Sequence, residues 1–329
     1  MSAGRRITEA SKVRPKIQRA GSIMTSGQPG VRDYVLLVTL AAIWGSSFMF
    51  IRLAVVEIPP VTVAAVRIAI AAAILFVVAR MAGQTLPRNW EIWITIAIAA
   101  VVGNVVPFIL ISWGQEQIDS GLAAILMATM PLTTLLLAHI FTSDEKLTIR
   151  KALGVGLGLV GLVVLMGPDK LAHLGDQTIR ELAVACAATC YGINALITKR
   201  LVHLPRRALA AAMLLVSSAV IVPISLLLDR PWTLSPGMVP LASVLVLGVV
   251  QTAVATMLLF AIVRRQGASF FSQINFLVPL FGVMWGVLIL AERPSANAYV
   301  ALVLILAGIA VVRGRASTQP SIERSKPAT

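Results

Sequence analysis

The sequence has very little charge for its length. Only 13% of its 329 residues are Asp, Glu, Lys or Arg, whereas 58% are hydrophobic. A soluble globular protein is about one quarter charged and rarely so apolar. Together with a mean hydropathy of +0.88, this composition excludes an ordinary soluble domain and predicts a chain whose apolar side chains face lipid.

The chain is also poor in residues that carry chemistry. It has two cysteines and three histidines, and neither kind forms a cluster with metal-ligand spacing. No nucleophile elbow or P-loop occurs, and Gly156–Gly161, which fits the spelling of a dinucleotide fingerprint, lies inside an apolar run instead of after a strand. We therefore expect no catalytic residues, no metal and no cofactor. Cys186 and Cys190 are expected to be buried packing residues.

Long apolar runs are what the sequence has in place of these features. A helix needs roughly 20 apolar residues to cross the hydrocarbon core of a bilayer. The runs do not alternate polar and apolar residues as barrel strands do, so the predicted fold class is an all-α integral membrane protein with ten transmembrane helices. The expected spans are Tyr34–Ile51, Pro60–Val78, Ile92–Ile111, Gly121–Phe141, Ala152–Met166, Leu182–Ile197, Ala208–Leu228, Val239–Val263, Phe270–Leu290 and Ala296–Val312.

The basic residues predict the orientation of these helices. Lysine and arginine are retained on the cytoplasmic side when they lie in short loops beside spans. Of the 28 basic residues, 22 lie in the two tails or in alternate loops that share one side. Both termini are therefore expected to be cytoplasmic, in a bacterial-type inner membrane, with residues 1–33 a basic disordered tail and residues 314–329 a second cytoplasmic tail. Topology and anionic lipid headgroups explain the net charge of +14 better than nucleic acid does.

An internal repeat divides the chain into two halves, residues 34–166 and 181–313. Each half holds five predicted spans, and because five is odd, two similar halves must cross the membrane in opposite senses. Inverted repeats of this kind build many secondary transporters. The pairs at an offset of 147 residues are Trp44-Gly45 with Tyr191-Gly192, Ser47 with Asn194, Asn104 with Gln251, Glu145 with Glu292 and Gly161 with Gly308, and Pro131 meets Pro279 at 148.

Short motifs recur in the same order in both halves. The first half has Trp44-Gly45-Ser46, Pro60 to Arg67, Ser120-Gly121-Leu122-Ala123, Met130-Pro131-Leu132 and Asp144-Glu145, and the second half has Gly267-Ala268-Ser269, Leu277-Val278-Pro279 and Ala291-Glu292-Arg293. In these motifs and their spacing, over roughly residues 35–166 and 181–313, the sequence resembles the EamA family of the drug/metabolite transporter superfamily. The resemblance implies five-plus-five inverted helices around a central cavity, and transport, commonly efflux, of amino acids or other small polar metabolites by alternating access.

Two classes of function remain open. The inverted repeat favours a transporter, with a nucleotide-sugar or lipid-carrier transporter as a variant, and the alternative is a non-transporting polytopic membrane protein or enzyme. The expected partners are a small-molecule substrate and membrane lipids, in a monomer or homodimer that binds no nucleic acid. All 14 acidic residues lie in tails, loops or outermost helical turns, so facilitated export and proton exchange through a boundary acid such as Glu116 are both open as the driving force.

The substrate cavity is predicted at the interface between the repeats. Trp44 and Ser47 are three residues apart and share a helix face, as do their repeat mates Tyr191 and Asn194. An aromatic wall with a polar neighbour suits a small amphipathic ligand. We therefore take these four residues as candidates for the substrate cavity.

Two amides and two prolines complete the repeat-related candidates. Asn104 and Gln251 lie deep in the third and eighth spans, where an unpaired amide is costly, so they either contact substrate or hydrogen-bond between helices. Pro131 and Pro279 fall near or within apolar spans, where each removes a backbone donor and is either a hinge or a tolerated kink. Their relation by the repeat favours a shared structural role.

Arg67 is the only charge well inside a predicted span, about 10 Å from the outer end of its helix. Its repeat position is Leu214, so the symmetry of the halves does not require a cation. Three roles are open: binding a substrate carboxylate, pairing with Glu57, Glu116 or Asp119, or snorkelling to the interface. Pairing is the role that the sequence favours, because buried charges are usually paired.

Overall fold

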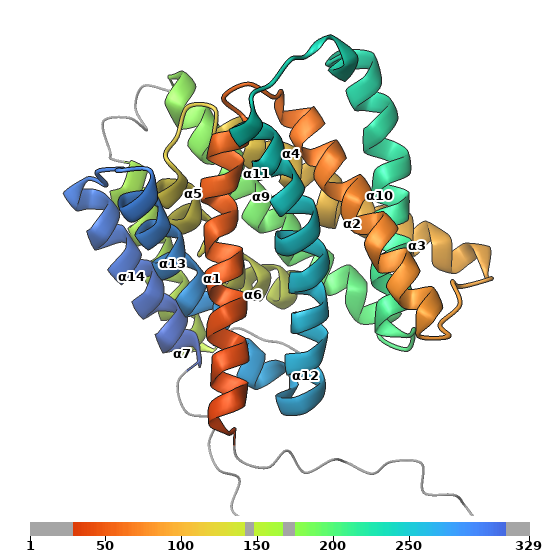
Figure 1. Cartoon of the computed structure of the whole chain (residues 1–329). Coiled ribbons are helices and arrows are strands. Elements are labelled where there is room, and N and C mark those ends of the chain that lie inside the picture. The colour runs from red at the N-terminus through yellow and green to blue at the C-terminus, as the bar shows by residue number, and fades with distance from the viewer. Residues whose placement is uncertain (1–28, 142–147, 167–174, 314–329) are drawn as a thin grey trace, which may run out of the picture.

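The structure, a computed structural model, describes residues 29–141, 148–166 and 175–313. Within these three segments every regular element is a helix, and the helices stand side by side in a bundle (Figure 1). Residues 1–28 and 314–329 of the predicted tails, and the Asp144-Glu145 motif, lie outside the described residues.

The helices follow one another with short connections, as apolar runs bounded by charges, glycine and proline predict. In the first half they are α1 (Val31–Ala54), α2 (Pro60–Met81), α3 (Trp90–Ala100), η1 (Val101–Val105), α4 (Val106–Gly114), α5 (Ser120–Met127), α6 (Met130–Phe141) and α7 (Ile149–Met166). In the second half they are α9 (Asp176–Thr198), η2 (Lys199–Leu201), α10 (Arg206–Leu228), η3 (Pro231–Thr233), α11 (Met238–Val246), η4 (Leu247–Val254), α12 (Ala255–Phe271), α13 (Ile274–Ile289) and α14 (Ala296–Arg313). Nine helical stretches in the described segments are long and apolar enough to cross a membrane, and α13, with 16 residues, is a shorter apolar helix.

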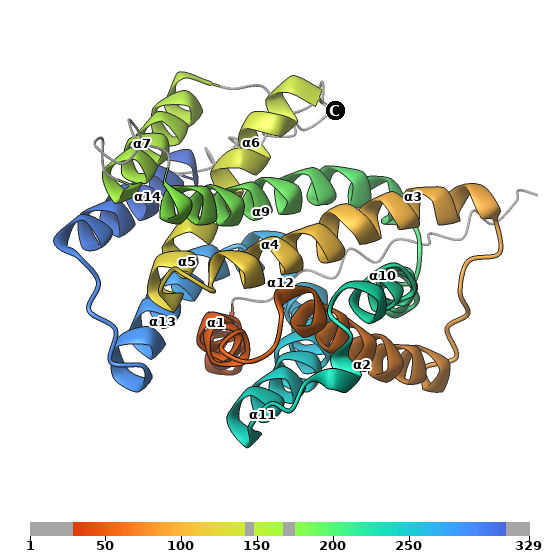
Figure 2. The ribbon, with the colours of Figure 1, turned by 90° about the horizontal axis from the view of Figure 1, so that it is seen from above.

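Equivalent helices of the two halves pack against each other across the bundle. In the view from above, α2 lies beside α10 and α7 lies beside α14 (Figure 2). The second pair is antiparallel, because Gly154 near the start of α7 contacts Gly308 near the end of α14, while Gly161 contacts Ala301 further along. Two helices that the repeat makes equivalent therefore cross the bundle in opposite directions.

The contact between α7 and α14 depends on small residues. A Cβ atom at Gly154 would lie 2.6 Å from the carbonyl oxygen of Gly308, and a Cβ atom at Gly308 would meet the carbonyl oxygen of Gly154 at the same distance. A Cβ atom at Gly158 would collide with Leu132 of α6. Of the three glycines that imitate a dinucleotide fingerprint, Gly158 and Gly161 thus serve close helix packing, whereas Gly156 has nothing within 4 Å of its Cβ position.

The span predicted over Gly121–Phe141 consists of two helices in the structure. α5 ends at Met127 and α6 begins at Met130, so the break directly precedes Pro131. The break has a physical reason, because the ring nitrogen of proline has no hydrogen to donate to the preceding turn. Pro279, the repeat mate, lies inside α13, where the helix continues. A hinge at either proline stays a prediction.

The ninth predicted span also differs from the structure at its start. It was expected to begin at Phe270, but α12 continues to Phe271 and α13 begins at Ile274. Within α12, Gly267 has a φ of 81°, a left-handed conformation that favours glycine, and the helix kinks there. The kink separates the last residues of α12 from its long apolar part.

The first helix starts earlier than the predicted boundary of the basic tail. α1 begins at Val31, so residues 31–33 belong to the helix instead of the tail. Asp33 is 4% exposed and accepts hydrogen bonds from Arg265 Nε and Gln266 Nε2, both at 2.7 Å. A carboxylate in the first turn is favoured by the helix dipole, which explains why a charged residue starts a membrane helix.

The expectation that both cysteines are buried is wrong. Cys186 is exposed and Cys190 is half-buried on α9. A groove of about 280 Å³ between α6, α7 and α9 includes Cys186 in its lining. A thiol behaves as a small apolar group, so it is tolerated on an outward helix face as well as in the interior.

Candidate substrate site

Two long helices of the bundle each contain a π-helical segment at a repeat-related place. η1 lies between α3 and α4, and η4 lies between α11 and α12. A π-helical segment adds a residue to a turn of α-helix, and such segments frequently occur at functional sites. Asn104 lies in η1 and Gln251 lies in η4. The two amides paired by the repeat are therefore both presented by irregular backbone.

Gln251 is 2% exposed and has one hydrogen-bonded end. Its Nε2 donates to Ser46 Oγ of α1 at 2.9 Å, and Ser46 Oγ donates to the carbonyl oxygen of Ile43 at 2.9 Å. Because the serine proton is committed to Ile43, Ser46 can only accept from the amide, which fixes the orientation of Gln251. Its Oε1 is left buried and without a partner among the described residues. Such an oxygen is costly to bury and suits a donor on a ligand.

Arg67 is a buried cation beside η4. The side chain is 7% exposed, its Nε donates to Thr252 Oγ1 at 2.9 Å, and its guanidinium carbon lies 4.0 Å from the ring centroid of Phe108. The Thr252 hydroxyl donates in turn to the carbonyl oxygen of Leu247 at 2.8 Å. Neither terminal nitrogen of Arg67 has a hydrogen-bond partner in the described part of the chain. The guanidinium is thus held by one edge and one face, with its other donors available.

The acidic partners expected for Arg67 are engaged elsewhere. Glu57 accepts a backbone N–H just before α11 at 2.6 Å, and Glu116 pairs with Arg180 of α9. The charges that act on Asp119 are those of Glu292 and an arginine of α1, not Arg67. The favoured prediction of a carboxylate pair is therefore wrong. These acids lie in connections at the end of the bundle, whereas the guanidinium turns toward η4.

Asn104 lies in η1, and Asn194 of α9 packs against the neighbouring Gly103. Asn104 Nδ2 donates to Ser217 Oγ of α10 at 3.1 Å, which joins two helices. The neighbouring Gly103 lets α9 approach, because a Cβ atom there would lie 2.4 Å from Cγ of Asn194. The Oδ1 of Asn194 is buried and has no partner among the described residues. A second amide oxygen without a donor thus lies against a π-helical segment.

Tyr191 and Trp44, which the repeat makes equivalent, have different surroundings. Tyr191 packs against both of the largest buried apolar clusters and interacts electrostatically with Arg67. Trp44 packs edge-on against Phe271 of α12, with ring centroids 6.0 Å apart. Ser47 is 7% exposed on α1. The structure therefore brings Tyr191 to the Arg67 region, whereas Trp44 belongs to the packing of α1 on α12.

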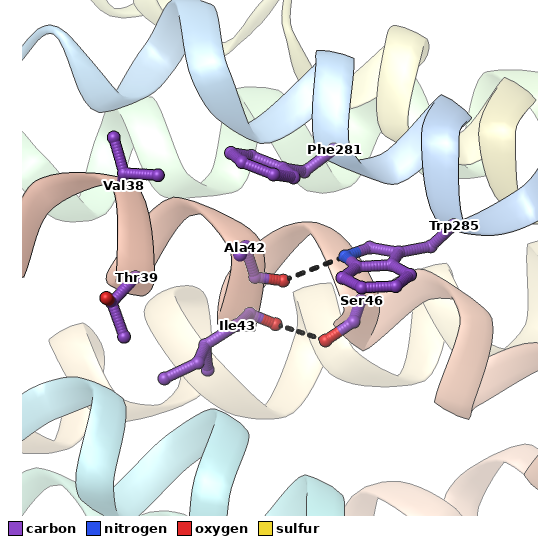
Figure 3. A pocket seen from close by; sticks show the side chains of 7 residues that line it. All are labelled: Val38, Thr39, Ala42, Ile43, Ser46, Phe281 and Trp285. Atoms are coloured by element: carbon purple, nitrogen blue, oxygen red, sulfur yellow. Dashed lines mark hydrogen bonds between the residues drawn. The ribbon is translucent and has the colours of Figure 1, made fainter. Parts of the chain in front are cut away.

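A groove of about 380 Å³ runs between α1 and α13 (Figure 3). Trp285 Nε1 donates to the carbonyl oxygen of Ala42 at 3.2 Å across this groove, and Ser46 lies in its wall. Because Ser46 also accepts from Gln251, one hydroxyl links the groove to the buried amide. The lining residues are Val38, Thr39, Ala42, Ile43, Ser46, Phe281 and Trp285.

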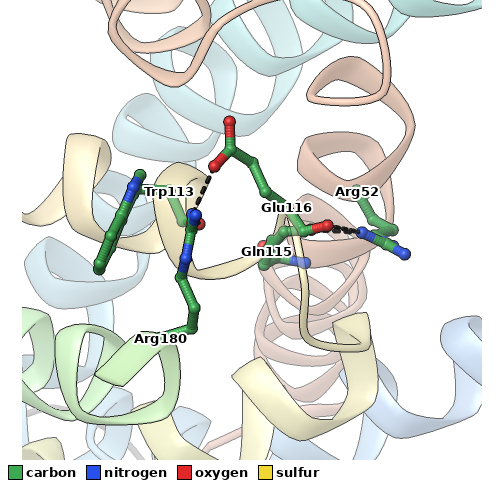
Figure 4. A network of polar contacts seen from close by, with 5 residues as sticks. All are labelled: Arg52, Trp113, Gln115, Glu116 and Arg180. Carbon is green, nitrogen blue, oxygen red and sulfur yellow. Dashed lines mark hydrogen bonds and ion pairs between the residues drawn. The ribbon is translucent and has the colours of Figure 1, made fainter. Parts of the chain in front are cut away.

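A polar network joins α1, the α4–α5 connection and α9 at the end of α1 away from the N-terminus (Figure 4). Arg52 donates to the carbonyl oxygens of Gln115 at 2.6 Å and Glu116 at 2.8 Å. Arg180 pairs with Glu116, and its guanidinium carbon lies 3.9 Å from the ring centroid of Trp113. Glu116, the boundary acid considered for proton exchange, is therefore held by a cation.

Three residues that hold the site together were missed by the sequence reasoning: Ser46, Thr252 and Phe108. Thr252 directly follows Gln251, and Ser46 lies in a motif already noted, yet neither contact could be predicted from spacing. The hydrogen bonds join residues 185 and 205 positions apart in different helices. The described residues include no group of three His, Cys, Asp or Glu side chains placed to hold a metal ion.

The bundle and its buried polar groups are those of a multi-pass membrane protein. Its described segments include nine membrane-length apolar stretches, with a cation and two amides enclosed between helices. The model of the EamA-like transporter family matches residues 32–167 and 178–314, which is most of the chain in two repeats. The chain belongs to the EamA-like transporter family. The resemblance carried by the sequence motifs is thereby confirmed.

Several relatives with transporter names are similar over most of their length. The "uncharacterized transporter YoaV" of Bacillus subtilis (strain 168) is 25% identical over 281 residues, covering 83% of this chain and 94% of that protein. The "probable amino-acid metabolite efflux pump" of Escherichia coli (strain K12) is 25% identical over 291 residues, covering 84% and 93%. The "uncharacterized inner membrane transporter YedA" of the same strain is 23% identical over 282 residues, covering 85% and 90%. A solved crystal structure with 19% identity and a TM-score of 0.62 covers 86% of this chain and 97% of its own, which shows the fold alone.

Proposed function

We propose that the chain is a secondary transporter of an inner membrane that exports amino acids or other small carboxylate-bearing metabolites. Its ten spans, α13 included, form two inverted five-helix halves with both termini in the cytoplasm, and substrate moves between the halves by alternating access. The antiparallel packing of α7 on α14 supports the inversion. The name of the Escherichia coli efflux pump supports the substrate class.

The observation that carries the proposal is the buried guanidinium of Arg67. Its Nε donates a hydrogen bond to Thr252, and the ring of Phe108 covers one face of the guanidinium. The two terminal nitrogens are left to bind a substrate. A guanidinium binds a carboxylate through two parallel hydrogen bonds and keeps its charge when buried. A substrate carboxylate would supply the counter-charge that no described side chain supplies.

Two amide oxygens offer acceptors for the other end of an amino acid. Gln251 is next in sequence to Thr252, which holds Arg67, and Asn194 lies one helical turn from Tyr191. Both amide oxygens are buried and have no donor among the described residues. An ammonium group has donors only, so a zwitterion matches a guanidinium and free carbonyl oxygens. If Gln251 served only to join helices, that role would account for its hydrogen-bonded nitrogen. It would not account for the buried oxygen, which has no partner among the described residues.

Flux through the purified protein in liposomes tests this function. The liposomes are loaded in turn with radiolabelled amino acids, with the amines that remain when the α-carboxylate is removed, and with nucleotide sugars. We expect efflux of at least one amino acid, and no competition from its matching amine. An amine that moves as fast as its amino acid would contradict the role of Arg67. Nucleotide-sugar flux would replace the proposed substrate class, and a wild-type protein that moves nothing would support the non-transporting alternative.

Reporter fusions test the proposed topology. A cytosol-active reporter placed after Arg315, and another placed directly before α1, are both expected to be active inside the cell. With both termini inside and five spans in each half, the first half would begin on the cytoplasmic side and the second half on the outer side. A reporter that is active outside at either terminus would contradict ten spans arranged as two inverted halves.

A further inference from the structure

The groove of about 280 Å³ between α6, α7 and α9 opens on the outside of the bundle. In the view from above, α6 and α7 lie at the edge of the bundle beside α9 (Figure 2). Each of the three helices contributes one exposed leucine to the lining, namely Leu136, Leu159 and Leu182. Exposed apolar side chains in the spans of a membrane protein face the acyl chains of the bilayer. The groove is therefore a hollow in the lipid-facing surface.

The floor of the groove is formed by close helix packing. A Cβ atom at Gly158 of α7 would lie 1.9 Å from Leu132 Cδ1 of α6, and both residues line the groove. On the other side α9 contributes small side chains, among them Ala185 and Cys186. These small residues leave a space beside the leucines that a slender apolar chain can occupy.

The length of the groove fits one leaflet of a membrane. Along α7 the lining extends from Val155 to Leu162. At 1.5 Å per residue this stretch is about 10 Å long. One leaflet contributes about half of a hydrocarbon core that is roughly 30 Å thick. The groove can therefore hold a large part of one acyl chain within a single leaflet.

A lysine lies at one end of this groove. Lys151 precedes Val155 by one helical turn in α7, so the two side chains share a helix face. Lys151 is half-buried, its backbone N–H donates to Thr148 Oγ1 at 3.3 Å, and its ammonium group has no partner among the described residues. The first turn of α7 adds the positive end of a helix dipole. This end of the groove therefore favours a negative charge.

The neighbouring arginines contact other helices. Arg150 Nε donates to the carbonyl oxygen of Val311 in α14 at 2.9 Å, and the guanidinium carbon of Arg313 lies 4.9 Å from the ring centroid of Phe276 in α13. Within the described chain, neither arginine nor Lys151 takes part in an ion pair. The arginines add positive charge to this end of the bundle, whereas Lys151 shares the helix face that lines the groove.

We propose that this groove binds an anionic phospholipid, with one acyl chain between α6, α7 and α9 and the phosphate beside Lys151. Burial of methylene groups supplies affinity that a free phosphate ion would lack, and the ammonium group supplies the preference for a negative headgroup. The proposed topology places Lys151 on the cytoplasmic side, so the lipid belongs to the inner leaflet. Only this choice of leaflet rests on the proposed function.

Native mass spectrometry of the purified full chain tests the site. The protein in detergent is titrated with phosphatidylglycerol and phosphatidylcholine that carry the same acyl chains, and with glycerol phosphate as the soluble headgroup. We expect phosphatidylglycerol to bind about fivefold more tightly than phosphatidylcholine, because a basic residue near the membrane surface contributes about this factor. Glycerol phosphate should neither bind nor displace the lipid.

Two variants separate the headgroup from the acyl chain. Lys151→Gln should weaken phosphatidylglycerol binding about fivefold and leave phosphatidylcholine binding unchanged. Cys186→Trp should weaken binding of both lipids about tenfold, because the indole fills the groove, and it should fold because Cys186 is exposed. The matched controls are Arg88→Gln, at an exposed cation of the α2–α3 connection, and Val163→Trp, at an exposed position of α7 outside the lining. Both controls should bind lipid as the wild-type protein does.

The outcomes decide the ligand and its placement separately. Equal affinity of the wild-type protein for the two lipids, or displacement of the lipid by glycerol phosphate, would overturn the proposed ligand. Unchanged phosphatidylglycerol binding in Lys151→Gln or in Cys186→Trp would overturn the placement, as would a control that loses as much affinity as its matched variant. The titration uses no transported substrate, so failure of the proposed export function would leave this test intact.

Discussion

The two π-helical segments share their place in the repeat and differ in chemistry. In η4, Gln251 is 2% exposed and is followed by Thr252, which holds the guanidinium of Arg67. In η1, Asn104 is half-buried and donates to a serine of α10. The residue equivalent to Arg67 is Leu214, which is 5% exposed. The repeat therefore duplicates the irregular backbone, whereas the buried guanidinium of Arg67 has no counterpart at Leu214.

The largest effect is expected at the cation itself. Arg67→Gln should lower amino-acid flux about 100-fold or more, because loss of one partner of a buried charge pair costs roughly 2–5 kcal/mol. Arg67→Lys should retain part of the flux, since an ammonium keeps the charge and loses the bidentate geometry. Arg80→Gln, at the exposed end of the same helix, is the control. Full flux per folded molecule in Arg67→Gln would mean that the asymmetry of the halves has no role in substrate binding.

A glycine in η1 tests whether the other segment is mainly structural. Gly103→Ala should destabilise the protein by about 1–3 kcal/mol, because the new Cβ atom would lie 2.4 Å from Cγ of Asn194 and crowd a packed interface. Gly156→Ala has nothing within 4 Å and should be stabilising by up to about 1 kcal/mol. Unfolding in detergent measures both. Equal stability of the two variants would contradict tight packing of α9 on η1.

The two amides compare the segments directly. Gln251→Leu should lower flux about tenfold, because it removes the free oxygen beside the cation site as well as the hydrogen bond to Ser46. Asn104→Leu should lower flux only about twofold and act mainly on thermal stability, since the amide joins helices. Flux of both variants is measured per folded molecule in liposomes. Unaltered flux in both would remove the amides from the substrate cavity.

The smallest effect concerns the dependence of stability on pH at Asp119. A carboxyl whose pKa is raised by burial and by Glu292 penalises the folded state when it is ionised, so the penalty is present at neutral pH. It disappears as the pH falls through the folded pKa toward the ordinary value. Asp119→Asn should therefore raise the thermal midpoint at neutral pH by about 1 °C, since partial exposure screens the effect. The gain should vanish near about pH 4, and a gain that persists there would contradict this cause.

The sequence predicted the class of fold from properties that sum over many residues. Apolar runs, the distribution of basic residues and the repeat offset each average over long segments, so single errors do not matter. The family followed from the order of short motifs in both halves and was confirmed by the match over residues 32–167 and 178–314. Helix ends were less predictable, because a break such as the one before Pro131 depends on the local backbone.

The site was harder to predict because its contacts cross the bundle. The sequence placed Arg67, Asn104 and Gln251 correctly inside helices, but it favoured a carboxylate partner for Arg67. Helical periodicity shows which residues share a face and does not show which helix that face meets. An added residue in a π-helical segment also rotates the side chains that follow it. Thr252 could therefore be identified as the partner of Arg67 only from the structure.

The hydroxyl of Ser46 determines whether the nitrogen or the oxygen of the Gln251 amide faces the interior. Its proton belongs to the carbonyl oxygen of Ile43, so Gln251 must turn its nitrogen toward the serine and its oxygen away. A residue at position 46 that donated instead of accepting would reverse the amide and present N–H groups where a carbonyl oxygen now lies. The local sign of the electrostatic potential is thus set by a side chain in the wall of the α1–α13 groove. A substitution at position 46 would therefore change which atoms Gln251 presents to the interior without any change at Gln251 itself.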